Sequence, residues 1–240
     1  MNTQIWAHRG ASEYAPENTL EAFELAIEQN ADGIELDVQL SKDGELVVIH
    51  DETLARVSGV KGEVRQFTLE ELQSLNVNRT KPEYKKAKIP TLEEVYRLMK
   101  PTALVINVEL KTGIYWYPHL EEKVMELTRK YQMEEQVIFS SFNHNSIRRM
   151  KELDSQVQTG ILFSDVMVDI CGYAGRLGVN ALHPALYHTK MDGVLEGAKE
   201  QGLALHVWTV NREEDMLELM KKGTEAIITN DPQKAVRLRR

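Results

Sequence analysis

Short apolar runs alternate with amphipathic segments along the whole chain. Eight runs have the length and composition of buried strands: Gln4–His8, Gly33–Gln39, Leu104–Leu110, Val137–Ser141, Thr159–Phe163, Ala181–His183, Leu205–Thr209 and Ala226–Thr229. Between them, several segments place apolar residues at helical spacing: Asn18–Gln29, Thr91–Met99, Leu120–Tyr131, Asn145–Leu153, Asp192–Gln201 and Glu213–Lys222.

Helix start signals support this division. Thr91 stands three residues before Glu94, which is a capping-box pattern. Asn18 or Thr19 is expected to cap the first helix. Strand followed by helix, repeated eight times in 240 residues, predicts an α/β fold: a closed (β/α)8 TIM barrel formed by one domain over residues 1–240. The alternative is a doubly wound open sheet, but no Gly-x-Gly-x-x-Gly follows the first strand, which weakens a dinucleotide-binding version of it.

The alternation is interrupted after the second strand. Ser41–Gly44 is a tight-turn signal, and the apolar run Leu46–Ile49 follows it. The strand is therefore expected to fold back as a hairpin, which brings His50 back towards the start of the second strand. The next stretch, about 52–87, is polar and weakly patterned, with only Thr68–Leu75 clearly helical. We interpret it as a small insertion between strand 2 and its helix.

Composition and charge limit the kinds of partner. An apolar share of 42% and a charged share of 28% are ordinary for a soluble globular protein. The net charge of −8 does not favour binding to nucleic acid or to an anionic membrane surface. No apolar run approaches membrane-spanning length, so no stable membrane insertion is expected. The sequence gives no indication of the oligomeric state.

The expected compartment is the cytoplasm. Cys171 is the only cysteine, so an intrachain disulfide is impossible, which fits a reducing environment. The segment Met1–Trp6 leads directly into a strand and lacks the basic and apolar regions of a signal peptide.

Carboxylates on two strands form the most informative chemical pattern. Side chains alternate along a strand, so Glu35 and Asp37 share one face, and Asn107, Glu109 and Lys111 share a face of the next strand. Buried carboxylates need compensation for their charge. Salt bridges to neighbouring strands would be one solution. Three carboxylates with oxygen donors alone also suit one divalent cation, Mg²⁺ or Ca²⁺, better than zinc.

Two histidines and two cations could complete such a site. His8 and Arg9 end the first strand, and barrel enzymes place their sites at these carboxyl ends. A histidine exchanges protons near neutral pH, and an arginine offers a fork of donors to phosphate. Alone, this pair is also typical of a capped strand end. His50 should return close to the paired carboxylates, while Lys111 could pair with Glu109, clamp a phosphate, or do both.

Aromatic residues lie near the same strand ends. Trp208 should share a face with His206, and Phe142 stands near the end of strand 4. Each suits either the core or an apolar wall for the non-reacting part of a ligand. The loop residues Tyr115–Tyr117 could line an entrance or pack against the insertion.

The motifs, taken in order, resemble those of glycerophosphodiester phosphodiesterases of the bacterial, intracellular type. The resemblance runs from about Ile5 to Pro232. Its motifs are His8-Arg9-Gly10, Pro16-Glu17-Asn18-Thr19, Glu35-x-Asp37-Val38, His50-Asp51, Asn107-x-Glu109-x-Lys111, Trp208-Thr209-Val210-Asn211 and Thr229-Asn230-Asp231-Pro232. Each motif is weak alone, but the ordered set is specific.

The resemblance implies a TIM barrel that hydrolyses glycerophosphodiesters, such as glycerophosphocholine or glycerophosphoethanolamine, to sn-glycerol 3-phosphate and an alcohol. It assigns catalysis to His8 and His50, and phosphate contacts to Arg9 and Lys111. It places one divalent cation, Mg²⁺ or Ca²⁺, on the three carboxylates Glu35, Asp37 and Glu109. The insertion would help to select the glycerol head group.

Two other functions fit the same residues. A lysophospholipase D would act on long-chain substrates and would need an exposed apolar entrance. A catalytically silent barrel would bind phosphodiesters as a sensor, although every proposed catalytic position carries a chemically competent side chain.

Overall fold

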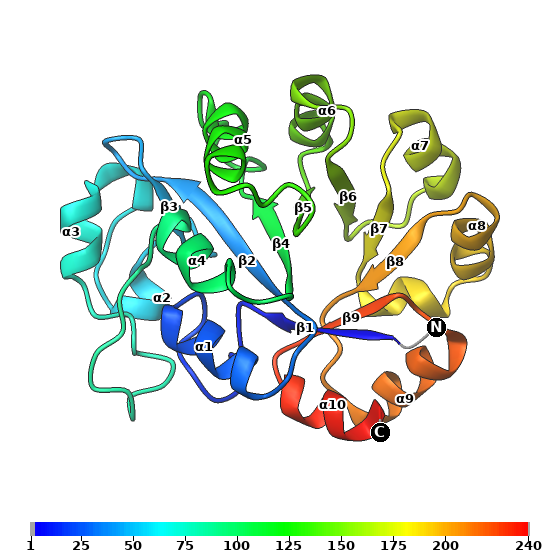
Figure 1. The fold of residues 1–240 in the computed structure, drawn as a ribbon, viewed down its shortest axis with the longest axis horizontal. Helices are drawn as coiled ribbons and strands as arrows, with labels where there is room; N and C mark the ends of the chain where they lie inside the picture. Colours follow the sequence, from blue (N-terminus) through cyan, green and yellow to red (C-terminus); the bar gives the residue numbers. More distant parts are fainter. Residues whose placement is uncertain (1–2, 240) are drawn as a thin grey trace.

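The computed structural model describes residues 3–239, and its centre is a closed barrel of parallel strands (Figure 1). The barrel order is β1-β2-β4-β5-β6-β7-β8-β9, and β1 pairs with both β2 and β9, which closes the ring. The strands are β1 (Gln4–His8), β2 (Gly33–Leu40), β4 (Val105–Leu110), β5 (Val137–Ser141), β6 (Gln158–Phe163), β7 (Ala181–Pro184), β8 (Ala204–Val207) and β9 (Ala226–Thr229). The predicted TIM barrel is confirmed, and the open sheet is wrong.

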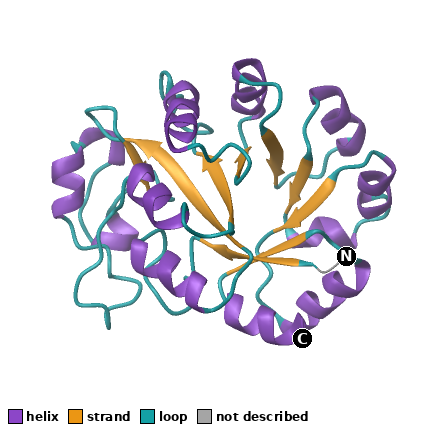
Figure 2. Ribbon diagram, in the orientation of Figure 1, coloured by secondary structure: helices purple, strands orange, loops and turns teal. Residues whose placement is uncertain are grey.

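Helices cover the outside of the barrel (Figure 2). They are α1 (Leu20–Glu28), α4 (Leu92–Met99), α5 (Leu120–Tyr131), α6 (His144–Leu153), α7 (Ile170–Leu177), α8 (Val194–Glu200), α9 (Glu213–Lys222) and α10 (Pro232–Arg239). As predicted, Thr91 and Glu94 form a capping box, and Thr19 caps α1. No helix within residues 3–239 combines the length and apolarity needed to cross a bilayer.

Two of these helices, α7 and α10, were not among the predicted segments. Helix α7 contains Gly172 and Gly175, which have low helix propensity and hide its periodicity. Helix α10 begins at Pro232, a residue that is favourable at a helix start but reads as a breaker in a sequence. The Asp231 carboxylate accepts the Lys234 backbone N–H and caps that first turn.

The segment after β2 folds onto the barrel as expected at its start. Strand β3 (Leu46–Val48) pairs antiparallel with β2, which confirms the hairpin. Helix α2 (Ala55–Ser58), a 3-10 turn η1 (Val64–Gln66) and helix α3 (Leu69–Ser74) follow.

This segment is less polar than its pattern suggested, because it has an apolar cluster of its own. The cluster comprises Val47, Ile49, Leu54, Val57, Val64, Leu72, Val77, Ala87 and Ile89. Many of these residues come from irregular backbone, so their burial follows no helical or strand period.

Strand register brings the polar positions into one layer. His8 on β1 lies beside Glu35 on β2, and Asp37 on β2 lies beside Glu109 on β4. Asn107 is the neighbour of Glu35 across the same pair of strands. The inward faces of three adjacent strands therefore build the site described next.

Candidate active site

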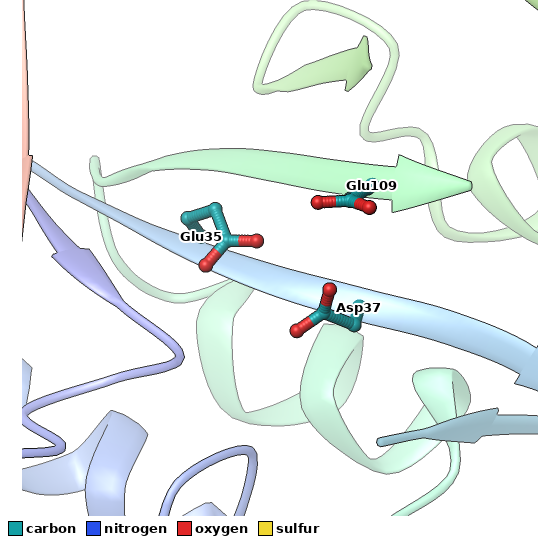
Figure 3. Close-up of side chains that lie close together, drawn as sticks. All are labelled: Glu35, Asp37 and Glu109. Atoms are coloured by element: carbon teal, nitrogen blue, oxygen red, sulfur yellow. The ribbon is translucent and has the colours of Figure 1, made fainter. Parts of the chain in front are cut away.

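Three buried carboxylates converge between the middle of β2 and the carboxyl end of β4 (Figure 3). One oxygen from each of Glu35, Asp37 and Glu109 lies within 4.8 Å of the other two. Three like charges at this separation repel one another strongly unless cations or protons compensate them.

The protein compensates these charges unequally. Burial, followed by repulsion from Asp37, raises the pKa of Glu35 well above its ordinary value. Burial likewise raises the pKa of Glu109. Burial alone would also raise the pKa of Asp37, but neighbouring positive groups, led by His50 and then Arg9, hold it at about 2.

The donor set fits a hard divalent cation. The Oδ1 atoms of Asp37 and Asn107 are buried and have no hydrogen-bond partner. Unsatisfied buried oxygens are costly, and a cation bound among oxygen donors would satisfy them. No thiolate or imidazole lies in the cluster of three, so the donors suit Mg²⁺ or Ca²⁺ better than zinc.

The His8 ring is held by a hydrogen bond at Nδ1. Its Nδ1 lies 2.6 Å from Oδ1 of Asn230, a pair that requires the hydrogen to be on Nδ1. The other nitrogen, Nε2, then carries a lone pair and lies 3.9 Å from Glu35. Burial, followed by the charge of Arg9, lowers the pKa of His8 to about 4, so the ring is neutral at neutral pH.

His50 is fixed by the hairpin and by a buried glutamine. The Ile49 N–H donates to the Asp37 carbonyl at 2.9 Å, which sets the hairpin against the metal-site strand. The Gln39 amide nitrogen lies 3.0, 3.1 and 2.9 Å from the carbonyl oxygens of Ile49, His50 and Asp51. The His50 ring pairs through Nδ1 with the Asp51 carboxylate at 2.7 Å, which leaves Nε2 free for proton exchange.

The two predicted cations lie against the carboxylates. Lys111 Nζ is 3.1 Å from Glu109 and 3.8 Å from Asp37, so the predicted ion pair is present. Arg9 donates to Glu17 at 2.8 Å, and its Nε is 3.5 Å from Asp37. That Arg9 Nε is buried and has no hydrogen-bond partner, so its charge acts on the nearby Asp37 carboxylate.

A cavity of about 80 Å³ joins most of these groups. Seven of the nine predicted site residues line it: His8, Arg9, Glu35, His50, Glu109, Phe142 and Trp208. The other two, Asp37 and Lys111, do not line the cavity but lie next to Glu109.

The two aromatic residues form one wall of this cavity. The rings of Phe142 and Trp208 pack edge to face, with centroids 5.6 Å apart. Strand β8 ends at Val207, but Trp208 continues its parallel pairing with β7 through a bridge to Ala185. Trp208 packs in the cluster of Trp6, whose ring also contacts His206, as the predicted shared face requires. Phe142 is exposed, which excludes the core interpretation for it.

An arginine in the insertion links the two halves of the site. Arg56 contacts Asp51 through Nε at 2.7 Å and Nη2 at 2.9 Å. It also contacts Glu17 through Nη1 at 2.5 Å and Nη2 at 2.9 Å. Because Asp51 holds His50 and Glu17 holds Arg9, one guanidinium connects a candidate proton carrier to a candidate phosphate ligand.

Sequence reasoning gave no role to several of these supporting residues. Gln39 could have been found, since it continues the inward face of Glu35 and Asp37. Asn18, expected above only as a possible helix cap, donates to Asp37 at 2.8 Å. Arg56 gives no such signal, because it belongs to a four-residue helix, too short to show a periodic pattern, that only the fold brings to the site.

Comparisons with known proteins agree with this geometry. The model of the glycerophosphoryl diester phosphodiesterase family matches residues 8–234. A glycerophosphodiester phosphodiesterase of Caldanaerobacter subterraneus is 44% identical over 239 residues, covering 99% of this chain and 98% of the relative. One from Bacillus altitudinis is 40% identical, with 99% and 98% covered.

A solved structure extends the similarity to three dimensions. The Oleispira antarctica phosphodiesterase, solved in complex with its product sn-glycerol-3-phosphate, has a TM-score of 0.85 and 28% identity, covering 98% of this chain and 96% of its own. With the sequence relatives matched along nearly their full length, the chain belongs to the glycerophosphodiester phosphodiesterase family and is a hydrolase of that class.

Proposed function

We propose that this enzyme hydrolyses glycerophosphodiesters, such as glycerophosphocholine or glycerophosphoethanolamine, to sn-glycerol 3-phosphate and an alcohol. The observation that carries the proposal is the presence of two histidines, two carboxylates and an arginine around one cavity. The product bound to the Oleispira relative supports the same substrate class.

Glu35, Asp37 and Glu109 would hold one divalent cation, Mg²⁺ or Ca²⁺. When bound, the cation supplies Lewis-acid stabilisation of negative charge on the phosphoryl group. Arg9 and Lys111 would bind the remaining phosphate oxygens and share the charge that develops in the transition state. Phe142 and Trp208 would contact the non-reacting part of the substrate and exclude water.

The two histidines would divide the proton transfers. Neutral His8 takes a proton through Nε2 from the nucleophile, either water or the neighbouring glycerol hydroxyl. Attack by the hydroxyl would give a cyclic phosphate, which water would then open to sn-glycerol 3-phosphate. A new P–O bond forms as the P–O bond to the alcohol breaks. His50 donates a proton to the departing oxygen, while the Asp51 carboxylate balances the charge of the protonated ring.

Metal dependence is the first test. We expect a coupled assay for sn-glycerol 3-phosphate to show turnover of glycerophosphocholine that a chelator abolishes and Mg²⁺ or Ca²⁺ restores. Full activity in chelator would remove the three carboxylates from the proposed role. Substrate binding without turnover at every metal concentration would instead support the sensor.

Arg56 provides a second test within the insertion. Replacing Arg56 by alanine should lower kcat/KM by about 10–100-fold, because groups that orient catalytic side chains typically contribute that much. Arg56→Lys should recover only part of the loss, since an ammonium lacks the planar fork. The matched control is Arg65→Ala: Arg65 lies in the same insertion but pairs with Glu63. Equal losses in the Arg56→Ala and Arg65→Ala variants would contradict the positioning role.

A further inference from the structure

Exposed apolar side chains are concentrated at the mouth of the barrel. Nine large apolar side chains are exposed within residues 3–239. Eight of them lie on the connections that follow barrel strands, at the end of the barrel that holds the active site. The exception is Leu217, on helix α9 at the side of the barrel.

Most of these residues form one continuous arc. Strands β4, β5, β6 and β7 are hydrogen-bonded neighbours in that order, so the connections after them are also neighbours around the mouth (Figure 1). We name as the apolar arc the seven exposed residues on these connections: Ile114, Trp116, Phe142, Val166, Met167, Val168 and Tyr187. The opposite half of the mouth is formed by the connections after β8, β9, β1 and β2, the last of which includes the insertion.

In the loop after β4, two tyrosines are held by contacts with the protein, and their neighbours in the arc stay exposed. The Tyr115 hydroxyl donates to Glu63 at 2.9 Å, and its ring lies 3.7 Å below the Arg65 guanidinium. Tyr117, two residues on, is buried and donates to Gln39 at 3.0 Å. Both tyrosines thus pack inward, and the alternating neighbours Ile114 and Trp116 are left 67% and 73% exposed. Of the three aromatics in this loop, only Trp116 is an exposed side chain.

The loop after β6 is held in a comparable way. The Tyr187 hydroxyl donates to the Ser164 carbonyl, and His188 Nε2 lies 3.1 Å from the Asp165 carbonyl. With the base of the loop fixed, Val166 and Val168 remain 67% and 97% exposed at its tip. Hydrogen bonds to the adjoining backbone thus fix the loop in a conformation that leaves these two side chains exposed.

The charge around the arc indicates what could cover it. Both signs of charge border the arc: Lys42, Arg65 and Lys123 line the same pocket as Ile114 and Trp116, whereas Asp165 and Asp169 flank the second loop. A border of both signs, on a chain with a net charge of −8, suits head groups that carry both charges better than a surface that is anionic alone. Tryptophan and tyrosine favour the boundary between water and a lipid interior, where an uncharged apolar rim is stabilised.

The arc is also continuous with the active site, because Phe142 belongs to both the arc and the cavity wall. We propose that the apolar arc docks the mouth of the barrel on the surface of a zwitterionic lipid aggregate, by shallow insertion of the tips around Trp116 and Val168. Docking would place the open cavity against phosphate-bearing head groups. It needs no turnover and therefore does not depend on the proposed hydrolysis.

Co-sedimentation with phosphatidylcholine vesicles tests this proposal. Wild-type protein should bind, and two double variants, Ile114→Ser with Trp116→Ser and Val166→Ser with Val168→Ser, should each lose about tenfold in partition coefficient. The matched control is Leu217→Ser, which removes an exposed apolar side chain outside the arc and should bind as wild type does. Release of sn-glycerol 3-phosphate from dissolved glycerophosphocholine should be unchanged in all of these variants.

Several results would overturn the docking surface. The proposal is wrong if wild-type protein does not bind the vesicles, or if it binds only vesicles that contain phosphatidylglycerol. It is also wrong if Leu217→Ser lowers the partition coefficient as much as the arc variants do. Light scattering that shows a dimer dissociated by the arc variants would also overturn the docking surface, because a second copy would then cover the arc. Vesicle binding with no turnover of any phosphodiester would refute the hydrolase proposal and leave the docking surface standing.

Discussion

Replacing His8 by alanine is expected to lower kcat for sn-glycerol 3-phosphate release by about 10²–10⁴-fold, the usual cost of removing a positioned acid or base. The structure orients this neutral imidazole beside the carboxylate cluster through its contact with Asn230. His50→Ala should show a loss of the same order, since it removes the other proton carrier.

Steady-state kinetics at saturating metal would measure these losses, with circular dichroism to verify folding. His119→Ala is the matched control, because that side chain is 80% exposed and lies outside the cavity. The two-histidine scheme also predicts a bell-shaped pH–rate curve. Its acid limb should fall as His8 gains a proton towards its pKa of about 4. Near-normal turnover in both histidine variants would disprove the scheme.

Glu35→Gln should abolish metal-dependent turnover while leaving the metal-free protein as stable as wild type or more so. The amide keeps the shape of the side chain but removes one of three converging charges. The remaining two carboxylates should bind a divalent cation far more weakly. Calorimetric titration with Mg²⁺ and Ca²⁺ would measure the loss, with the surface change Glu135→Gln as control.

The same cluster should make metal-free stability depend on pH. The pKa of Glu35 is higher in the folded protein than in the unfolded chain, chiefly because of burial. Its protonated form therefore stabilises the fold below the ordinary pKa of glutamate, and this contribution is lost as the pH rises through the raised pKa. Thermal melts in chelator should show Tm falling over that range in wild type and falling less in Glu35→Gln. A steeper fall of Tm with pH in Glu35→Gln than in wild type would contradict the conclusion that the pKa of Glu35 is raised in the folded protein.

Much of this structure could be predicted because local patterns agree with the global fold. The barrel strands are short apolar runs, and helices α5 and α9 have the predicted boundaries. The alternation along β2 and β4 was enough to place three carboxylates on inward faces. The hairpin signal was enough to return His50 to them.

The supporting contacts could not be predicted, since they join residues that no local period relates. Asn230 reaches His8 across 222 positions in the chain, because the barrel closes between β9 and β1. Arg56 reaches Glu17 across 39 positions, because an irregular insertion packs over the mouth. Such pairings depend on the path of the whole backbone.

The sequence by itself determined the class of fold, the acidic cluster and the two histidines proposed as proton carriers, because periodicity and turn chemistry are local properties. Only the tertiary structure decided the hydrogen-bond partner of each histidine, the coupling through Arg56 and the apolar arc around the mouth. Those features depend on distances between distant segments and on which side chains remain exposed once the barrel closes.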